Sequence, residues 1–346
     1  MVVTTNYGCT DESAPKRLEG LGATPPVDFG WVSECSDSTA FIISDLVRNY
    51  ASDVEWSLKF GDNNSASGGA NDSIVKHAYA TVNDYIVTMT VGSGENGCSD
   101  STYKTIYIRD SHTPSVSNPY FVDFENGQAG WLDEYKVVVD ATNDLSIKYD
   151  TLGSSWEYGT PNKSIINGAH SGNSAWVTGI NDNYAANENS EITSPCFNFD
   201  VDSLQKPMIK IWINAATFVG IDGAVLQYKA DDTPWTILGN LNTGINWFNQ
   251  NNIVGDPGEQ DIQQIIGENK AGWTGFTKDS SWVEVRHSLD SLIGKENIRF
   301  RIAFGSLFEG DTTQSYDGFA FDDIWIGERN KVALMEHFTK IGRAHV

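Results

Sequence analysis

Apolar stretches of a few residues recur along the whole chain and are separated by clusters of Gly, Asn and Ser. In residues 85–91 apolar and polar side chains alternate, which is the pattern of a strand with one buried face. Residues 207–213 and 298–304 are apolar at most positions, and residues that favour strands are frequent there. No stretch keeps the apolar period of a long amphipathic helix. The pattern predicts an all-β fold made of many short strands.

One strand-like segment, residues 316–326, carries charge where a buried strand should avoid it. Asp322 and Asp323 stand side by side among aromatic and aliphatic residues. A similar apolar segment that begins at residue 120 carries Asp123 and Glu125. A buried carboxylate must be hydrogen-bonded or must bind a cation. We expect the two segments to be the first and last strands of one β-sandwich, lying close together.

Composition limits the partners of the chain. Its 346 residues, 40% hydrophobic and 12% aromatic, suffice for two or three globular domains. The formal charge is −23, from 46 acidic and 23 basic residues, which argues against nucleic acid or an anionic membrane as a partner. No apolar run approaches the ~18 residues of a membrane span, so no membrane insertion is expected. The acidity indicates a solvated surface, with Ca²⁺ binding as the alternative.

The four carboxylates of the two acidic segments are the strongest candidates for a metal site. Carboxylate oxygens are the ligands that Ca²⁺ prefers, so we predict a structural calcium site formed by Asp123, Glu125, Asp322 and Asp323. Because side chains alternate along a strand, Asp322 and Asp323 should point to opposite faces, and only one of them can be a ligand. The alternative is that these carboxylates cap turns or accept hydrogen bonds from backbone amides.

The tryptophans raise the question of carbohydrate binding, because an exposed aromatic ring can stack on a sugar. Residues 242–278 are rich in Asn and Gly and are predicted to form a long irregular loop. Four aromatic residues in this loop or in another Asn-rich stretch are therefore the predicted ligand surface: Tyr184, Trp247, Trp273 and Phe276. Four tryptophans in apolar strands are predicted to be core: Trp56, Trp212, Trp282 and Trp325.

The four cysteines form no metal or redox motif, since no C-x-x-C occurs. Either a disulfide between Cys35 and Cys98 or free buried thiols fits the sequence. A disulfide would imply an oxidising, extracytoplasmic compartment.

Signatures of catalysis are missing from the sequence. The chain contains no H-E-x-x-H, no G-x-S-x-G, no P-loop and no Rossmann glycine pattern. We therefore expect no enzyme activity in this chain. A glycoside hydrolase built from two carboxylates stays as an alternative, because sequence spacing does not reveal their geometry.

Three segments within residues 25–110 resemble the PKD domain. Residues 56–62 read W-S-L-K-F-G-D, residues 77–79 read H-A-Y, and residues 84–91 read D-Y-I-V-T-M-T-V. The chain departs from the family pattern by two residues inserted after Trp56, by Asn63 in place of a Gly, and by Asp84 in place of a Gly. The resemblance implies an immunoglobulin-like β-sandwich. The segment around Cys9 echoes the one around Cys98, so residues 1–20 are expected to be the tail of an upstream copy.

Residues 120–327 resemble the MAM-like jelly-roll domains that are appended to secreted bacterial proteins. The resemblance rests on D-F-E-N-G at residues 123–127, S-G-N-S-A-W at 171–176 and D-G-F-A-F-D-D-I at 317–324. It implies a larger jelly-roll β-sandwich and a structural cation where its first and last strands meet. MAM domains of animal receptors carry paired cysteines, whereas Cys196 is alone in this part of the chain.

The organisation that follows is a PKD-like domain and a jelly-roll domain joined by a linker of turn residues at 111–119. Residues 328–340 are expected to begin a further domain, and residues 341–346 resemble a translated sequencing adapter. We expect a monomeric fragment of a secreted or cell-surface bacterial protein, with the jelly roll binding an extracellular glycan or protein in adhesion. The alternatives are a pure spacer and a glycoside hydrolase.

Overall fold

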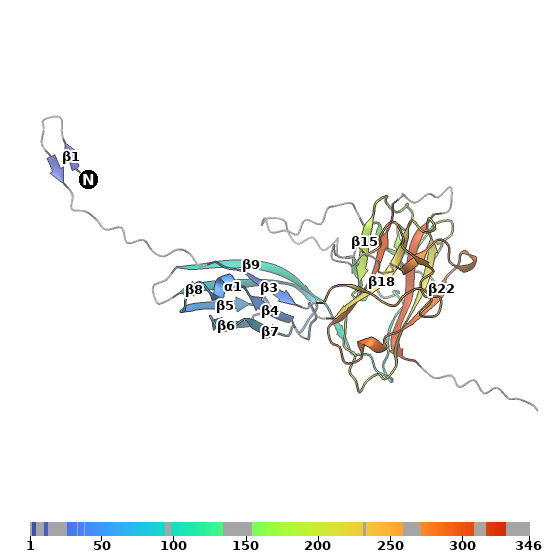
Figure 1. The fold of residues 1–346 in the computed structure, drawn as a ribbon, viewed down its shortest axis with the longest axis horizontal. Helices are drawn as coiled ribbons and strands as arrows, with labels where there is room; N and C mark the ends of the chain where they lie inside the picture. The colour runs from blue at the N-terminus through green and yellow to red at the C-terminus, as the bar shows by residue number, and fades with distance from the viewer. Residues whose placement is uncertain are drawn as a thin grey trace, which may run out of the picture. The chain divides into compact units, whose positions relative to one another are not determined.

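The computed structural model describes residues 2–4, 10–12, 26–32, 34–37, 39–93, 98–133, 154–230, 233–258, 271–307 and 316–329. The regular secondary structure of these residues is almost entirely β-strand, as predicted (Figure 1). The described helices are α1 (Asp45–Arg48) and the 3-10 helices η2 (Lys278–Ser280) and η3 (Asp290–Leu292). None of the helices in the described part of the chain is long and apolar enough to cross a membrane. Contacts divide the chain into two compact units.

The first unit comprises residues 1–34, 38–79 and 83–108 and is a β-sandwich. Its sheets have the strand orders β3-β4-β7 and β6-β5-β8-β9, and β1 pairs with β2 in a separate ladder. Alternate side chains of β4, β5 and the middle of β8 are buried, and most of them belong to one apolar cluster. The strands are β1 (Val2–Thr4), β2 (Thr10–Glu12), β3 (Phe29–Val32), β4 (Thr39–Ile43), β5 (Val54–Lys59), β6 (Ser65–Gly69), β7 (Ile74–His77), β8 (Asn83–Ser93) and β9 (Ser99–Ile108).

The residues that carry the resemblance to the PKD domain serve packing in this unit. Trp56 is buried, as predicted, and its Nε1 donates a hydrogen bond to the carbonyl oxygen of Gly69 at 3.1 Å. The His77 ring stacks on Phe60 with 4.1 Å between the ring centroids, and its Nε2 lies 2.8 Å from Oδ2 of Asp62. These contacts give the motif residues a packing role in the unit.

The second unit comprises residues 35–37, 80–82 and 109–346 and contains two sheets. The larger sheet has nine strands: β10 (Ser111–His112), β12 (Leu132–Asp133), β15 (Asn189–Thr193), β16 (Cys196–Phe197), β18 (Gly223–Ala230), β19 (Thr236–Ile237), β20 (Gln250–Asn251), β21 (Ala271–Thr274) and β23 (Ile298–Gly305). The smaller sheet has six: β11 (Tyr120–Val122), β13 (Trp156–Gly159), β14 (Ala175–Thr178), β17 (Pro207–Ala216), β22 (Val283–Ser288) and β24 (Gly318–Glu328).

One large apolar cluster joins side chains from both sheets of the second unit. From β17 it takes Ile209, Ile211 and Ile213, which alternate with the partly exposed residues of that strand. The predicted pairing of the first and last strands is present, because β11 runs antiparallel to β24 with Val122 opposite Ile324. The unit is a two-sheet β-sandwich, which agrees with the predicted fold class.

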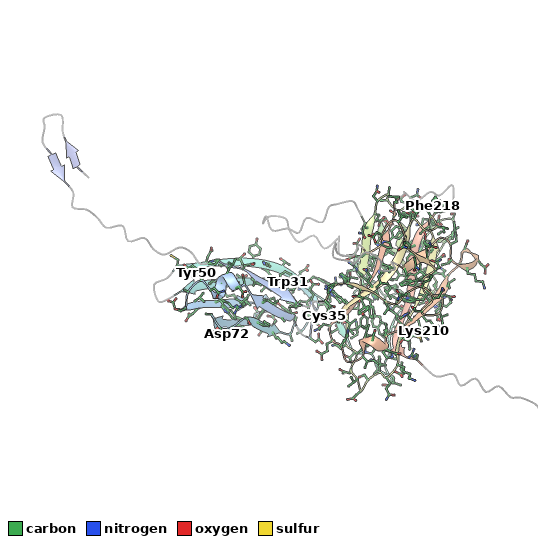
Figure 2. All side chains as sticks on the ribbon, in the orientation of Figure 1. Trp31, Cys35, Tyr50, Asp72, Lys210 and Phe218 are labelled. Carbon is green, nitrogen blue, oxygen red and sulfur yellow. A yellow bond between two sulfur atoms is a disulfide. The ribbon has the colours of Figure 1, made fainter. Side chains whose placement is uncertain are left out.

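The predicted Cys35–Cys98 disulfide is wrong, because Cys35 bonds to Cys196 (Figure 2). The two Cα atoms are 5.8 Å apart, although 161 residues separate them in sequence. Cys35 forms a bridge with Arg109, and the following strand β10 runs parallel to β16 with Ser111 opposite Cys196. Residues 111–112, expected to be linker, are therefore part of a sheet. Cys9 and residues 330–346 lie outside the described residues.

Candidate functional site

Both carboxylates of the acidic strand β24 bind the turn at residues 170–171. Oδ2 of Asp322 accepts hydrogen bonds from the backbone N–H groups of His170 at 2.9 Å and Ser171 at 3.1 Å. Oδ2 of Asp323 lies 2.5 Å from Nδ1 of His170, and its Oδ1 accepts from the Ser171 hydroxyl at 2.9 Å. The prediction that Asp322 and Asp323 point to opposite faces is therefore wrong.

A β-bulge explains why strand alternation fails at this point. The register between β17 and β24 shifts between Lys210 and Trp212, and Asp323 has a positive φ of 45°. A bulge inserts one extra residue and turns its side chain out of the regular alternation. The bulge thus allows two consecutive carboxylates to reach one turn.

Glu125 binds the next part of the same turn. Its Oε1 accepts hydrogen bonds from the backbone N–H groups of Asn173 at 2.8 Å and Ser174 at 2.7 Å. Gly172 has a φ of +57°, and a Cβ built there would lie 2.1 Å from Cδ of Glu125, so only glycine fits. Asp123 contacts Glu125 itself, since its Oδ1 accepts a hydrogen bond from the Glu125 N–H at 3.2 Å.

A buried lysine fixes the other end of this loop. Nζ of Lys163 donates to the carbonyl oxygen of Thr178 at 2.7 Å and to that of Asp317. The Asp317 carboxylate in turn accepts from the N–H groups of Ile165 and Ile166. Burial lowers the pKa of Lys163 to about 8, and the nearby Asp317 opposes that shift. The loop is held at both ends by buried charges that are hydrogen-bonded to backbone.

The predicted calcium ligands do not form a cation cage in this geometry. Oδ2 of Asp322 and Oε1 of Glu125 each accept two N–H groups, which use both lone pairs of the oxygen. Among the residues that the structure describes, no group of three His, Cys, Asp or Glu side chains is arranged to hold a metal. The N–H groups that donate to these carboxylates fit the turn-capping alternative, and the melting temperature with and without Ca²⁺ decides between that alternative and a calcium site.

Burial raises the pKa of Asp322 to about 7, although three backbone N–H groups favour its charged form. The His170 ring beside it stacks on Trp212 with 3.6 Å between the ring centroids. The carboxylates, the histidine and the indole form a tightly packed structural cluster.

The predicted ligand surface is wrong for three of its four residues. Tyr184, Trp247 and Trp273 are 0%, 1% and 3% exposed, so none of them can stack on a sugar. Their polar atoms bond inside the unit, for example Tyr184 to Asp222 Oδ2 at 2.8 Å. The fourth, Phe276, is 41% exposed. The loop prediction failed because Trp273 belongs to strand β21, which pairs with β18.

Three of the four tryptophans expected in the core lie on the outer face of the smaller sheet or beside it. Trp212 and Trp325 are half-buried and alternate with the core residues Ile211 and Ile324. Trp282 is half-buried as well and packs against a small cluster around Val177. Most of the aromatic residues that were expected at the surface of the unit are therefore buried, and most of the tryptophans expected in the core are partly exposed.

A cavity of about 370 Å³ opens in the second unit beside β12, β13 and β14. It lies at an edge of the smaller sheet, where β13 is the outermost strand. Two aromatic rings, two aliphatic side chains, two carboxylates and one amide line it: Gln128, Leu132, Asp133, Glu157, Tyr158, Trp176 and Ile180.

The walls of this cavity are held by the sandwich. Trp176 is opposite Tyr158 in the β13–β14 ladder, and their ring centroids are 5.8 Å apart. The Tyr158 hydroxyl donates to the carbonyl oxygen of Phe124, and Oε2 of Glu157 accepts from the Ile180 N–H at 2.6 Å. Chemically, the cavity offers aromatic carbon surface next to hydrogen-bonding oxygens.

Sequence reasoning missed these cavity residues. The alternation in residues 155–159 indicates that Trp156 and Tyr158 share a face, but nothing in it reveals the proximity of Gln128 and Asp133. That proximity depends on β12 pairing with β15 in the other sheet.

No family model and no curated protein matches the chain. Among solved structures, one described as showing the promiscuous specificity of carbohydrate-binding modules from the beta-sandwich super family is 15% identical, with a TM-score of 0.28. That match covers 88% of this chain and 96% of the other. A Bacteroides uniformis beta-glucuronidase is 7% identical over 85% of this chain and 27% of its own, with a TM-score of 0.21. At these TM-scores the likenesses carry no argument about function.

Proposed function

We propose that the second unit is a non-catalytic carbohydrate-binding module whose site is the cavity beside β12 and β13. The observation that carries the proposal is the meeting of the Tyr158 and Trp176 rings with the side chains of Gln128, Asp133 and Glu157. A sugar presents an apolar C–H face and a rim of hydroxyl groups. The half-buried Tyr158 ring, backed by the buried Trp176 ring, suits the face, and carboxylate and amide oxygens accept from the hydroxyls.

The charge and size of the cavity narrow the class of sugar. Among the described residues its lining contains two carboxylates and no Lys, Arg or His, so a carboxylated or sulfated sugar would be repelled. The volume of about 370 Å³ is near the lower end of ligand sites, which run from roughly 300 to 1,000 Å³. A short neutral oligosaccharide, with one or two units inside the cavity, is the ligand class that fits.

A glycoside hydrolase is the second candidate, because Asp133 and Glu157 line the same cavity. Glycosidases use two carboxylates that flank the scissile bond. Against hydrolysis, Glu157 is bonded to the Ile180 N–H, and Asp133 is almost completely buried. A carboxylate held in this way is better suited to accepting a hydrogen bond from a sugar hydroxyl than to transferring a proton.

The setting that fits such a module is extracytoplasmic. The Cys35–Cys196 disulfide supports this location, since disulfides persist in oxidising compartments. The first unit, with its resemblance to the PKD domain, then acts as a spacer in a secreted or surface-attached bacterial protein, and the second attaches it to glycan.

Titration calorimetry of the full chain against neutral oligosaccharides tests the function. Cello-, xylo-, manno- and laminari-tetraose are suitable probes, and the same samples are analysed for shortened products. Binding without product supports the module. Product formation that is lost in Glu157→Gln would establish the hydrolase instead, and absence of binding to neutral glycans overturns the proposal.

A further inference from the structure

The outer face of the smaller sheet carries a row of four side chains across four strands. Phe121 of β11 lies opposite Trp325 of β24, and Trp325 lies opposite Lys210 of β17. Lys210 in turn lies opposite Arg286 of β22. Directly paired residues share a face of a sheet, so these four side chains form one continuous row, about 14 Å long at the usual strand spacing.

This row faces away from the core. The neighbours of its members along the strands, such as Val122, Ile211 and Ile326, belong to the buried apolar cluster. Phe121 is 57% exposed, and Trp325, Lys210 and Arg286 are half-buried.

Glycine 327 makes room for the indole of the row. A Cβ on Gly327 would lie 2.7 Å from Cζ2 of Trp325, so the indole extends along its own strand over the glycine. The row thus places two aromatic surfaces side by side on one face of the sheet.

The charged half of the row is basic, in a protein with a formal charge of −23. Nζ of Lys210, a residue labelled in Figure 2, lies 4.3 Å from the centroid of the Trp325 ring. Arg286 uses its Nε for Glu284, which leaves the two terminal nitrogens of its guanidinium for other acceptors. Lys210 and Arg286, the latter paired through its Nε with Glu284, therefore stand in one row with two aromatic rings.

We infer that this row, here called the outer row (Phe121, Trp325, Lys210 and Arg286), binds a polysaccharide whose sugars carry carboxylates. The exposed Phe121 ring packs on the C–H face of a sugar, while Lys210, which lies over the Trp325 ring, and Arg286 pair with the carboxylates of the polymer. Two cations in the row match a polymer that carries one carboxylate per sugar. A polymer with more negative charges per sugar would be repelled more strongly by the net negative charge of the chain.

The outer row is separate from the cavity proposed to bind neutral sugar. No residue is common to the two, and the cavity is lined by carboxylates whereas the row presents cations. The inference stands whether or not the cavity binds its ligand.

Affinity electrophoresis of the full chain in gels that contain polygalacturonate tests the inference. The matched control polymer is the same polysaccharide with its carboxyl groups reduced to alcohols. We expect retardation by polygalacturonate, at least tenfold weaker retardation by the reduced polymer, and weakening with added salt. Equal retardation by both polymers, or none by polygalacturonate, overturns the inference.

Variants locate the site on the outer row. Lys210→Met is expected to weaken binding about tenfold, and Phe121→Ala to weaken it severalfold. Phe121 is exposed, so its replacement by Ala leaves no cavity and should not disturb the fold. Lys295→Met removes the same charge from an exposed turn after η3 and should leave binding within twofold of the unchanged protein. Unchanged binding by both row variants would assign the polymer to another surface and overturn the inference.

Discussion

Asp322 and Asp323 are consecutive residues of one strand, yet both carboxylates bind the backbone or side chains of His170 and Ser171. The bulge at Asp323 makes this possible. The acidic residues that stand out in an apolar strand therefore hold a loop on the outer face of the sheet.

The first prediction concerns this capping role. Asp322→Ala leaves the N–H groups of His170, Ser171 and Asp323 without this acceptor in a buried site, so it should lower the free energy of unfolding by about 2–4 kcal/mol. Asp202→Ala, at an exposed turn, is the matched control and should change it by less than about 0.5 kcal/mol. Urea unfolding followed by tryptophan fluorescence measures both. Equal stability of the two variants would contradict the capping role.

The second prediction concerns calcium at Asp123, Glu125, Asp322 and Asp323. Asp123, Glu125 and Asp322 already accept hydrogen bonds from backbone N–H groups, and Asp323 is bonded to the side chains of His170 and Ser171. We therefore expect the melting temperature of the full chain to be the same in millimolar Ca²⁺ and in chelator. A melting temperature that rises when Ca²⁺ is added, and no longer rises in Glu125→Gln, would show instead that these carboxylates bind the cation.

The third prediction is a pH dependence of stability that arises from Glu188. This carboxylate is buried, and burial raises its pKa, although Ser190, Ser155 and Ala185 donate hydrogen bonds to it. A raised pKa means that the folded state holds the proton more tightly than the unfolded state, whose value is near 4.5. Stability from this group is therefore complete below pH 4.5 and declines as the pH rises through the folded pKa.

The Gln side chain of Glu188→Gln cannot titrate, so the free energy of unfolding of this variant should decline less steeply as the pH rises above 4.5. The measurement is the free energy of unfolding of both proteins from pH 4 to pH 8, where a difference of one pKa unit corresponds to about 1.4 kcal/mol. Identical slopes for the two proteins would show that Glu188 does not contribute.

The fourth prediction concerns the Cys35–Cys196 disulfide. It closes a long loop, since its cysteines are 161 residues apart, and loss of such a bond costs about 2–5 kcal/mol. Cys35→Ala/Cys196→Ala should melt at a lower temperature than the unchanged protein under oxidising conditions. Reductant should remove that difference. If the two proteins melt alike without reductant, the bond does not stabilise the fold.

Much of the fold could be predicted from the sequence, because strand alternation and turn residues are local signals. The pairing of the segments that contain Tyr120 and Trp325 could be predicted as well, from their shared acidic pattern. The Cys35–Cys196 bond could not, since it depends on a parallel pairing between β10 and β16 that leaves no local trace.

The site was harder to predict for a physical reason. A strand that is apolar on both faces does not reveal which face is core, so Trp325 was expected inside while Ile324 and Ile326 occupy that place. Conversely, an Asn- and Gly-rich segment concealed strand β21, which buries Trp273. Exposure of an aromatic residue depends on the partner strands, which lie far away in sequence.

The central claim is that the cavity beside β12 and β13 binds a neutral oligosaccharide through its own side chains. Calorimetric titration of Gln128→Ala against the tetraose that the unchanged protein binds tests it most directly. Gln250→Ala, an exposed glutamine on β20 of the other sheet, is the matched control. We predict an affinity at least tenfold lower for Gln128→Ala and an unchanged affinity for Gln250→Ala. Equal affinities for the two variants and the unchanged protein would contradict the assignment of this cavity as the site.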